Sequence, residues 1–179
     1  MTGKEHVNLV QRSAAWLRSH SHSIVVTELT TGGGEEPDAI GFNMWLSTLI
    51  ECKTSRSDFL ADAKKPWRRD PARGLGYFRY FCCPKGLIDI KELPENWGLL
   101  ETSGNGLRVK QPAKPIVKRN YRAEISILVS VLRRVGQSPI NGISVRCYTY
   151  NTGNRATVGI ESPALVLSNQ TESSSHRPI

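Results

Sequence analysis

An apolar segment that ends in three polar residues constrains this chain more than any other feature of its sequence. Residues 47–53 have the composition of a buried strand and end in Glu51, Cys52 and Lys53. Side chains alternate along a strand, so we expect Glu51 and Lys53 on one face, about 7 Å apart, and Cys52 on the other. Unpaired charge is costly at the end of a buried strand. The pattern therefore indicates a surface ion pair or a reactive site.

Asp38 favours the reactive site. It begins a second predicted strand, residues 37–42, and a short turn near Asn43 would return the chain so that the two strands pair. Asp38, Glu51 and the backbone carbonyl of Cys52 would then supply oxygen ligands suited to Mg²⁺, with Mn²⁺ as a substitute. Lys53 would orient or deprotonate an attacking water and offset charge on a scissile phosphate. In the competing interpretation, Asp38 caps a turn and Glu51 and Lys53 form an exposed pair of little energetic value.

Periodicity places these residues in a mixed α/β domain. Apolar residues at positions 7, 10, 14 and 17 predict a helix over 4–19. Strands are predicted for 24–29, 37–42 and 47–53, and a helix for 58–65 that is capped by Ser55 or Ser57 and stopped by Pro66. An aromatic strand at 77–83, a hairpin at 97–111 and a helix at 121–135 follow. We expect one domain over 1–135, a weakly structured extension over 136–166 and a disordered tail over 167–179.

Composition restricts the classes of function. No apolar run approaches the roughly 18 residues of a membrane helix, and the first residues lack the apolar core of a secretory signal. The four cysteines form no C-x-x-C pair, which argues against a zinc site and a disulfide framework. We expect a soluble cytoplasmic protein that binds no membrane.

The distribution of charge suggests a polyanionic partner. The net charge is +8, yet residues 19–52 contain no Lys or Arg. Basic residues dominate after position 53, interleaved with Trp67 and Tyr77. Such side chains could contact phosphates without reading base sequence; the alternative is solvated surface charge. The nucleic-acid-binding candidates are Arg56, Lys64, Lys65, Arg68, Arg69 and Arg73.

These motifs together resemble the PD-(D/E)XK nuclease superfamily. The resemblance rests on Pro37-Asp38, then Glu51-Cys52-Lys53, with a predicted helix on either side. The segments IECKTSRSDFLADAKKPW, YFRYFCCPKGLI and LPENWGLLE are closest in pattern to MmcB-like DNA repair proteins and related bacterial and phage nucleases. The similarity covers about residues 4 to 111.

The resemblance implies a restriction-endonuclease-like α-β-β-β-α-β core and metal-dependent hydrolysis of DNA, for repair, recombination or phage DNA processing. Asp38 and Glu51 would be metal ligands and Lys53 the catalytic lysine. Many members add a glutamate from the first helix; Glu5 and Glu28 compete for that place. The alternative is a non-catalytic nucleic-acid-binding or adaptor protein with the same fold. An RNA substrate and a homodimer both stay open.

Overall fold

The computed structural model describes residues 3–29 and 35–135. The predicted extension and tail lie outside these residues. Two long helices, α1 and α4, have the predicted bounds, and the two shorter helices α2 and α3 lie between them in the chain. The elements are α1 (Lys4–Ser19), β1 (Ile24–Thr27), β2 (Ala39–Phe42), β3 (Ser47–Cys52), α2 (Arg56–Asp62), α3 (Pro66–Arg69), β4 (Phe78–Cys83), β5 (Gly98–Ser103), β6 (Gly106–Gln111) and α4 (Tyr121–Val135), with short 3₁₀ helices at Pro71–Arg73 and Ile90–Glu92.

The strands form one six-stranded mixed sheet in sequence order, β1 to β6. β1, β2 and β3 are antiparallel, β3, β4 and β5 are parallel, and β5 and β6 close the sheet as an antiparallel hairpin. The parallel connection from β3 to β4 carries α2 and α3. This arrangement confirms the predicted α/β class and the order of helix, three strands, helix and strand, followed by a hairpin and a helix.

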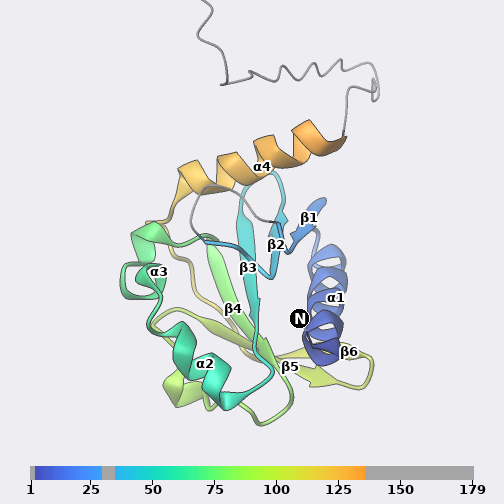
Figure 1. Cartoon of the computed structure of the whole chain (residues 1–179), viewed down its shortest axis with the longest axis vertical. Helices are drawn as coiled ribbons and strands as arrows, with labels where there is room; N and C mark the ends of the chain where they lie inside the picture. The colour runs from blue at the N-terminus through green and yellow to red at the C-terminus, as the bar shows by residue number, and fades with distance from the viewer. Residues whose placement is uncertain (1–2, 30–34, 136–179) are drawn as a thin grey trace, which may run out of the picture. The chain divides into compact units, whose positions relative to one another are not determined.

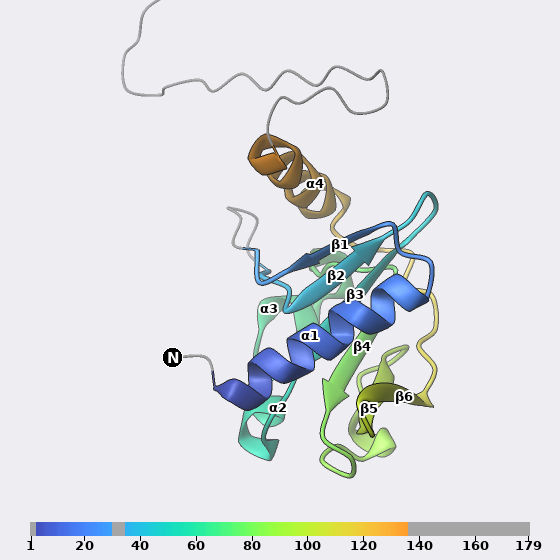
Figure 2. The same ribbon diagram turned by 90° about the vertical axis from the view of Figure 1, so that its right-hand side faces the viewer.

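Helices cover both faces of the sheet (Figures 1 and 2). On one face, α1 packs Leu9, Val10 and Leu17 against the alternating side chains of β3 and β4. On the other face, α2 and α4 contribute to a second apolar cluster, which contains Phe59 and Ile127. None of the described helices is long and apolar enough to cross a membrane.

Two local predictions need correction. Val7 was expected in the buried stripe of α1, but it is exposed; the buried face instead contains Leu9, Val10, Ser13, Ala14 and Leu17. Pro66 was expected to stop helical structure. It ends the first helix but begins α3 at a position where a missing N–H costs nothing. Ser55 is confirmed as the cap of α2, since its hydroxyl accepts from Asp58 N–H.

Candidate active site

Asp38 and Glu51 come together because β2 and β3 pair in an antiparallel register. Ala39 lies opposite Ile50, so the adjoining residues Asp38 and Glu51 stand across from each other. The Cys52 N–H donates a 2.7 Å hydrogen bond to Asp38 Oδ2, which holds this carboxylate against β3. The N–H and C=O of one strand residue point to the same side. The Cys52 carbonyl therefore points to the same side of β3 as its N–H.

The two carboxylates repel each other where little water screens them. The side chain of Glu51 is 2% exposed and that of Asp38 is 21% exposed. Burial, and then the negative charge of Glu51, raise the pKa of Asp38 to about 6. Among the described residues, Glu51 Oε1 finds no hydrogen-bond partner. A buried carboxylate oxygen without a donor is unfavourable, so the space shared by Asp38 and Glu51 favours a cation.

Lys53 lies on the same face as Glu51, and Cys52 packs on the opposite face against α1, as alternation along the strand predicts. The Lys53 Nζ is 3.0 Å from Asp62 Oδ1 and 3.5 Å from Glu51 Oε2. Burial alone would lower the pKa of Lys53, but the charges of Glu51 and Asp62 outweigh it and raise the pKa. Lys53 is therefore protonated at neutral pH. Of its two predicted roles, this favours electrostatic stabilisation over deprotonation of water.

The prediction that Arg68 lies on the basic, phosphate-contacting surface was wrong. Its side chain is only 2% exposed, because α3 turns it inward from the surface that was expected to contact phosphates. Its guanidinium donates to Glu35 and Asp62 and lies 3.2 Å from Glu51 Oε2. The contacts with neighbouring carboxylates outweigh burial and raise the Arg68 pKa. Arg68 is thus the central counterion of a buried acidic cluster and is not placed to bind DNA.

Asp62 and Glu35 belong to the same cluster, and sequence reasoning assigned neither of them to the site. Asp62 is buried at the end of α2, and Arg68 and Lys53 overcome the effect of burial to lower its pKa to about 2. Glu35 is also buried; its second oxygen accepts a 2.7 Å hydrogen bond from the Leu75 N–H. An exposed-looking helix and a glycine-rich loop gave no sequence signal that these two acids would turn inward.

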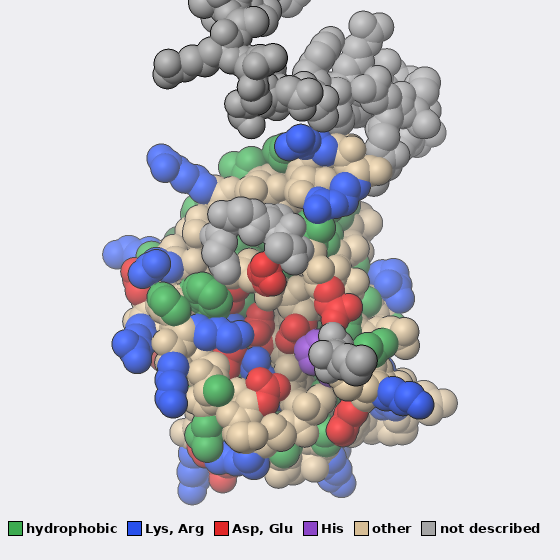
Figure 3. Space-filling model, viewed as in Figure 1, with side chains coloured by type: hydrophobic (Ala, Val, Ile, Leu, Met, Phe, Trp, Pro, Cys, Tyr) green, Lys and Arg blue, Asp and Glu red, His purple; other side chains and the backbone are tan. Residues whose placement is uncertain are grey.

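The remaining basic candidates lie toward the surface. Acidic side chains gather near the middle of the face shown in Figure 3, and Lys and Arg side chains project around them. Lys65 is half-buried and lies 3.6 Å from Glu51 Oε2, so it links the basic surface to the carboxylates. Arg56 forms a two-pronged ion pair with Glu92. Arg56 is exposed, as are the candidates Lys64, Arg69 and Arg73.

The structure separates the two candidates for a further acidic ligand. Glu5 lines a surface hollow together with Arg12 and the hairpin between β5 and β6. Glu28 instead follows β1, and its N–H donates to the Asp38 carbonyl at 3.2 Å. Its side chain approaches His6, which also faces Asp38. Glu28 is therefore the better-placed alternative, and His6 is a neighbour of the site that sequence reasoning missed.

The donor set fits a divalent metal of the kind that the family resemblance implies. The supporting observations are the unpartnered Glu51 oxygen and the raised pKa of Asp38. Both features would be relieved by a cation between the carboxylates. Among the described residues, however, no group of three or more His, Cys, Asp or Glu side chains already stands in a metal-binding arrangement. Asp38, Glu51 and the Cys52 carbonyl would hold the ion.

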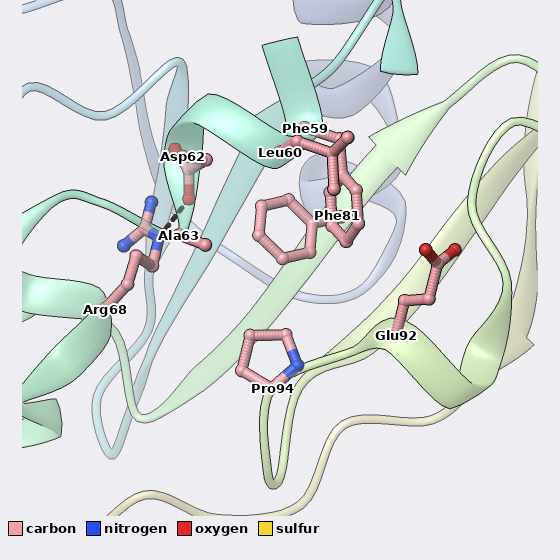
Figure 4. A pocket seen from close by; sticks show the side chains of 8 residues that line it. All are labelled: Phe59, Leu60, Asp62, Ala63, Arg68, Phe81, Glu92 and Pro94. Carbon is pink, nitrogen blue, oxygen red and sulfur yellow. Dashed lines mark hydrogen bonds and ion pairs between the residues drawn. The ribbon is translucent and has the colours of Figure 1, made fainter. Parts of the chain in front are cut away.

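A separate pocket of about 120 Å³ lies between α2 and β4. Figure 4 shows the ion pair of Asp62 and Arg68 on one side of this pocket, with the rings of Phe59, Phe81 and Pro94 around it. These largely apolar walls are poorly suited to a charged phosphodiester. We therefore place the candidate active site at the opposed carboxylates and regard the pocket as a neighbouring feature.

Comparison with known proteins supports the fold alone. No family model matches the chain, and no curated protein matches it either. A solved structure is similar: the SPO1766 protein of unknown function from Silicibacter pomeroyi, with a TM-score of 0.58 and 24% sequence identity. The alignment covers 75% of this chain and 91% of that protein.

Proposed function

We propose that this protein is a divalent-metal-dependent nuclease that hydrolyses phosphodiester bonds in DNA. The observation that carries the proposal is the opposed pair of Asp38 and Glu51. One oxygen of Glu51 has no hydrogen-bond partner among the described residues, and the protonated amine of Lys53 lies 3.5 Å from the other. The Asp38 and Glu51 carboxylates could bind a cation beside the Lys53 ammonium. This arrangement suits a reaction in which negative charge develops on a phosphate.

The residues divide the work in this proposal. Asp38, Glu51 and the Cys52 carbonyl would hold the metal, which would supply Lewis acidity and activate a water molecule. Asp62 fixes the Lys53 ammonium, whose positive charge offsets the charge on the scissile phosphate. Lys65, half-buried at the edge of the cluster, contacts the substrate backbone. Phosphate contacts of this kind position a duplex without reading its sequence, which favours structure-selective or non-specific cleavage.

The test measures cleavage of supercoiled plasmid, single-stranded DNA, branched DNA and RNA, each with Mg²⁺, Mn²⁺ or EDTA. Asp38→Asn, Glu51→Gln and Lys53→Met should each reduce metal-dependent cleavage by about 100-fold or more. Glu36→Gln and Lys85→Met are matched controls, because these two residues are exposed and should retain wild-type activity. Circular dichroism must show that every variant is folded.

Two outcomes would contradict the proposal. Tight DNA binding without cleavage under any metal would favour the alternative, a non-catalytic nucleic-acid-binding or adaptor protein. Cleavage that survives both Asp38→Asn and Glu51→Gln would place the active site elsewhere. Cleavage of RNA in preference to DNA would keep the site but change the substrate.

A further inference from the structure

His6 occupies an unexpected position beside the candidate metal ligands. Its Nε2 atom lies 3.5 Å from Asp38 Oδ1 and 3.7 Å from Glu28 Oε1. Both separations exceed the usual N–H···O distance of about 2.9 Å, so the ring faces two carboxylates without a hydrogen bond to either. The His6 side chain is 20% exposed.

The position of His6 follows from the observed phase of α1. The buried residues Leu9 and Val10 lie three and four positions after His6, so His6 extends the sheet-facing side of the helix by one turn. Glu28 reaches the same place from the end of β1. Its φ of +48° is unusual for a residue with a side chain, and its N–H is tied to the Asp38 carbonyl. Three different elements therefore direct side chains to one point.

The separations are close to those of atoms that share a metal ion, although no described group of three or more His, Cys, Asp or Glu side chains already stands in a metal-binding arrangement. Ligands at about 2.0 to 2.2 Å from one ion stand roughly 3.0 to 3.5 Å apart. The His6 contacts are slightly wider than this, so a bound ion would draw the three side chains together by a few tenths of an ångström. The buried oxygen of Glu51, the residue opposite Asp38, has no hydrogen-bond partner among residues 3–29 and 35–135, and this independently favours a cation at the site.

We propose that His6 is a nitrogen ligand of the metal held by Asp38, and that the site therefore prefers a first-row transition ion such as Mn²⁺ over Mg²⁺. Imidazole is a good ligand for transition ions, whereas Mg²⁺ favours oxygen ligands and gains little from a nitrogen. Glu28 supplies a further oxygen at the outer side of the site. This inference rests on the proposed function because it assumes the same metal site, but it does not require that the protein cleaves DNA.

The experiment uses the full chain and Mn²⁺ alone, with no DNA. Electron spin-echo measurements on bound Mn²⁺ should show coupling to a ¹⁴N nucleus in the wild type, and this coupling should be lost in His6→Ala and in His6→Gln. The Mn²⁺ affinity should fall about 10- to 100-fold in both variants, while the Mg²⁺ affinity changes less than about 3-fold. His20→Ala is the matched control, because His20 is exposed on the other end of the same helix and stacks on Trp16.

The outcomes separate this inference from the proposed function. If the wild type binds Mn²⁺ without ¹⁴N coupling, and Asp38→Asn weakens that binding, the His6 inference is refuted and the metal-dependent function stands. If the wild type binds neither Mn²⁺ nor Mg²⁺, both proposals fail. Coupling that persists in His6→Ala would assign the nitrogen to another residue and would equally refute the role of His6.

Discussion

Replacing Asp38 with asparagine should stabilise the metal-free protein at neutral pH, although it removes a proposed metal ligand. Asp38 has a folded-state pKa of about 6 against an ordinary value of 3.8. Each pKa unit corresponds to about 1.4 kcal/mol, so ionisation of Asp38 costs the folded state about 3 kcal/mol relative to the unfolded state. Asparagine avoids this cost, and its carbonyl oxygen can still accept the hydrogen bond from the Cys52 N–H.

The sign of the effect fixes its pH dependence. A carboxyl whose pKa is raised by folding binds its proton more tightly in the folded state. Its contribution to stability is complete below pH 3.8 and is lost as the pH rises through about 6. The difference in unfolding free energy, Asp38→Asn minus wild type, should therefore increase by about 3 kcal/mol between about pH 4 and 7. Above pH 7 this difference should stay constant.

Urea unfolding followed by tryptophan fluorescence, in EDTA and at a series of pH values from 4 to 8, measures this difference. Glu36→Gln is the control, because Glu36 is an exposed acid close to Asp38 and should give a difference that barely changes with pH. Mn²⁺ at about 100 times its dissociation constant should raise the free energy of unfolding of the wild type by about 2.7 kcal/mol. The same addition should raise that of Asp38→Asn only a little. Parallel pH curves for the wild type and Asp38→Asn would refute the reasoning.

Three further outcomes are expected. Arg68→Ala should lower the free energy of unfolding by about 3 to 5 kcal/mol, because it leaves buried carboxylates unpaired, whereas the exposed Arg69→Ala should change it by less than about 0.5 kcal/mol; urea unfolding of both variants checks the contrast. Asp62→Asn should cost about 2 kcal/mol at pH 7, a deficit that shrinks as the pH falls from 3.8 toward the folded-state pKa of about 2; urea unfolding at pH values extended down to about 2 measures it, and a deficit that stays constant over that range would argue against it. Lys64→Ala should reduce the salt dependence of DNA binding by about 0.9 in the slope of log K against log salt, and an unchanged slope would remove Lys64 from the interface.

Long periodic segments were predictable from the sequence, and short junctions were not. α1 and α4 have the predicted bounds because an apolar face that repeats over several turns is a strong signal. The segment around Pro66 was misread, since the same residue can end one helix or begin another. That one turn determines where Arg68 lies, so a basic surface residue became a buried counterion.

In the candidate site, too, some residues were predictable from the sequence and others were not. Asp38 and Glu51 were predictable because a strand register relates them directly. His6 was missed because Val7 was assigned to the buried stripe of α1; starting from the observed Leu9 and Val10 face, the same periodicity points to His6. Asp62 has a local i,i+3 ion pair with Lys65, but its contacts with Lys53 and Arg68 join three different segments, and no local pattern encodes them.

The charges around Glu51 favour a cation-binding site over a purely structural cluster of ion pairs. Its Oε2 atom lies within 3.6 Å of Lys53, Lys65 and Arg68, so this oxygen is amply compensated. Its Oε1 atom, on the same carboxylate, has no hydrogen-bond partner in the described part of the chain. Most buried polar atoms are hydrogen-bonded, because each unsatisfied atom costs about 1 to 3 kcal/mol; among the described side chains, Trp67 Nε1 and Arg68 Nη2 are the other buried atoms without such a partner. A cation between Glu51 and Asp38 would remove the cost at Glu51, which is why we favour a metal-binding site over a purely structural ion cluster.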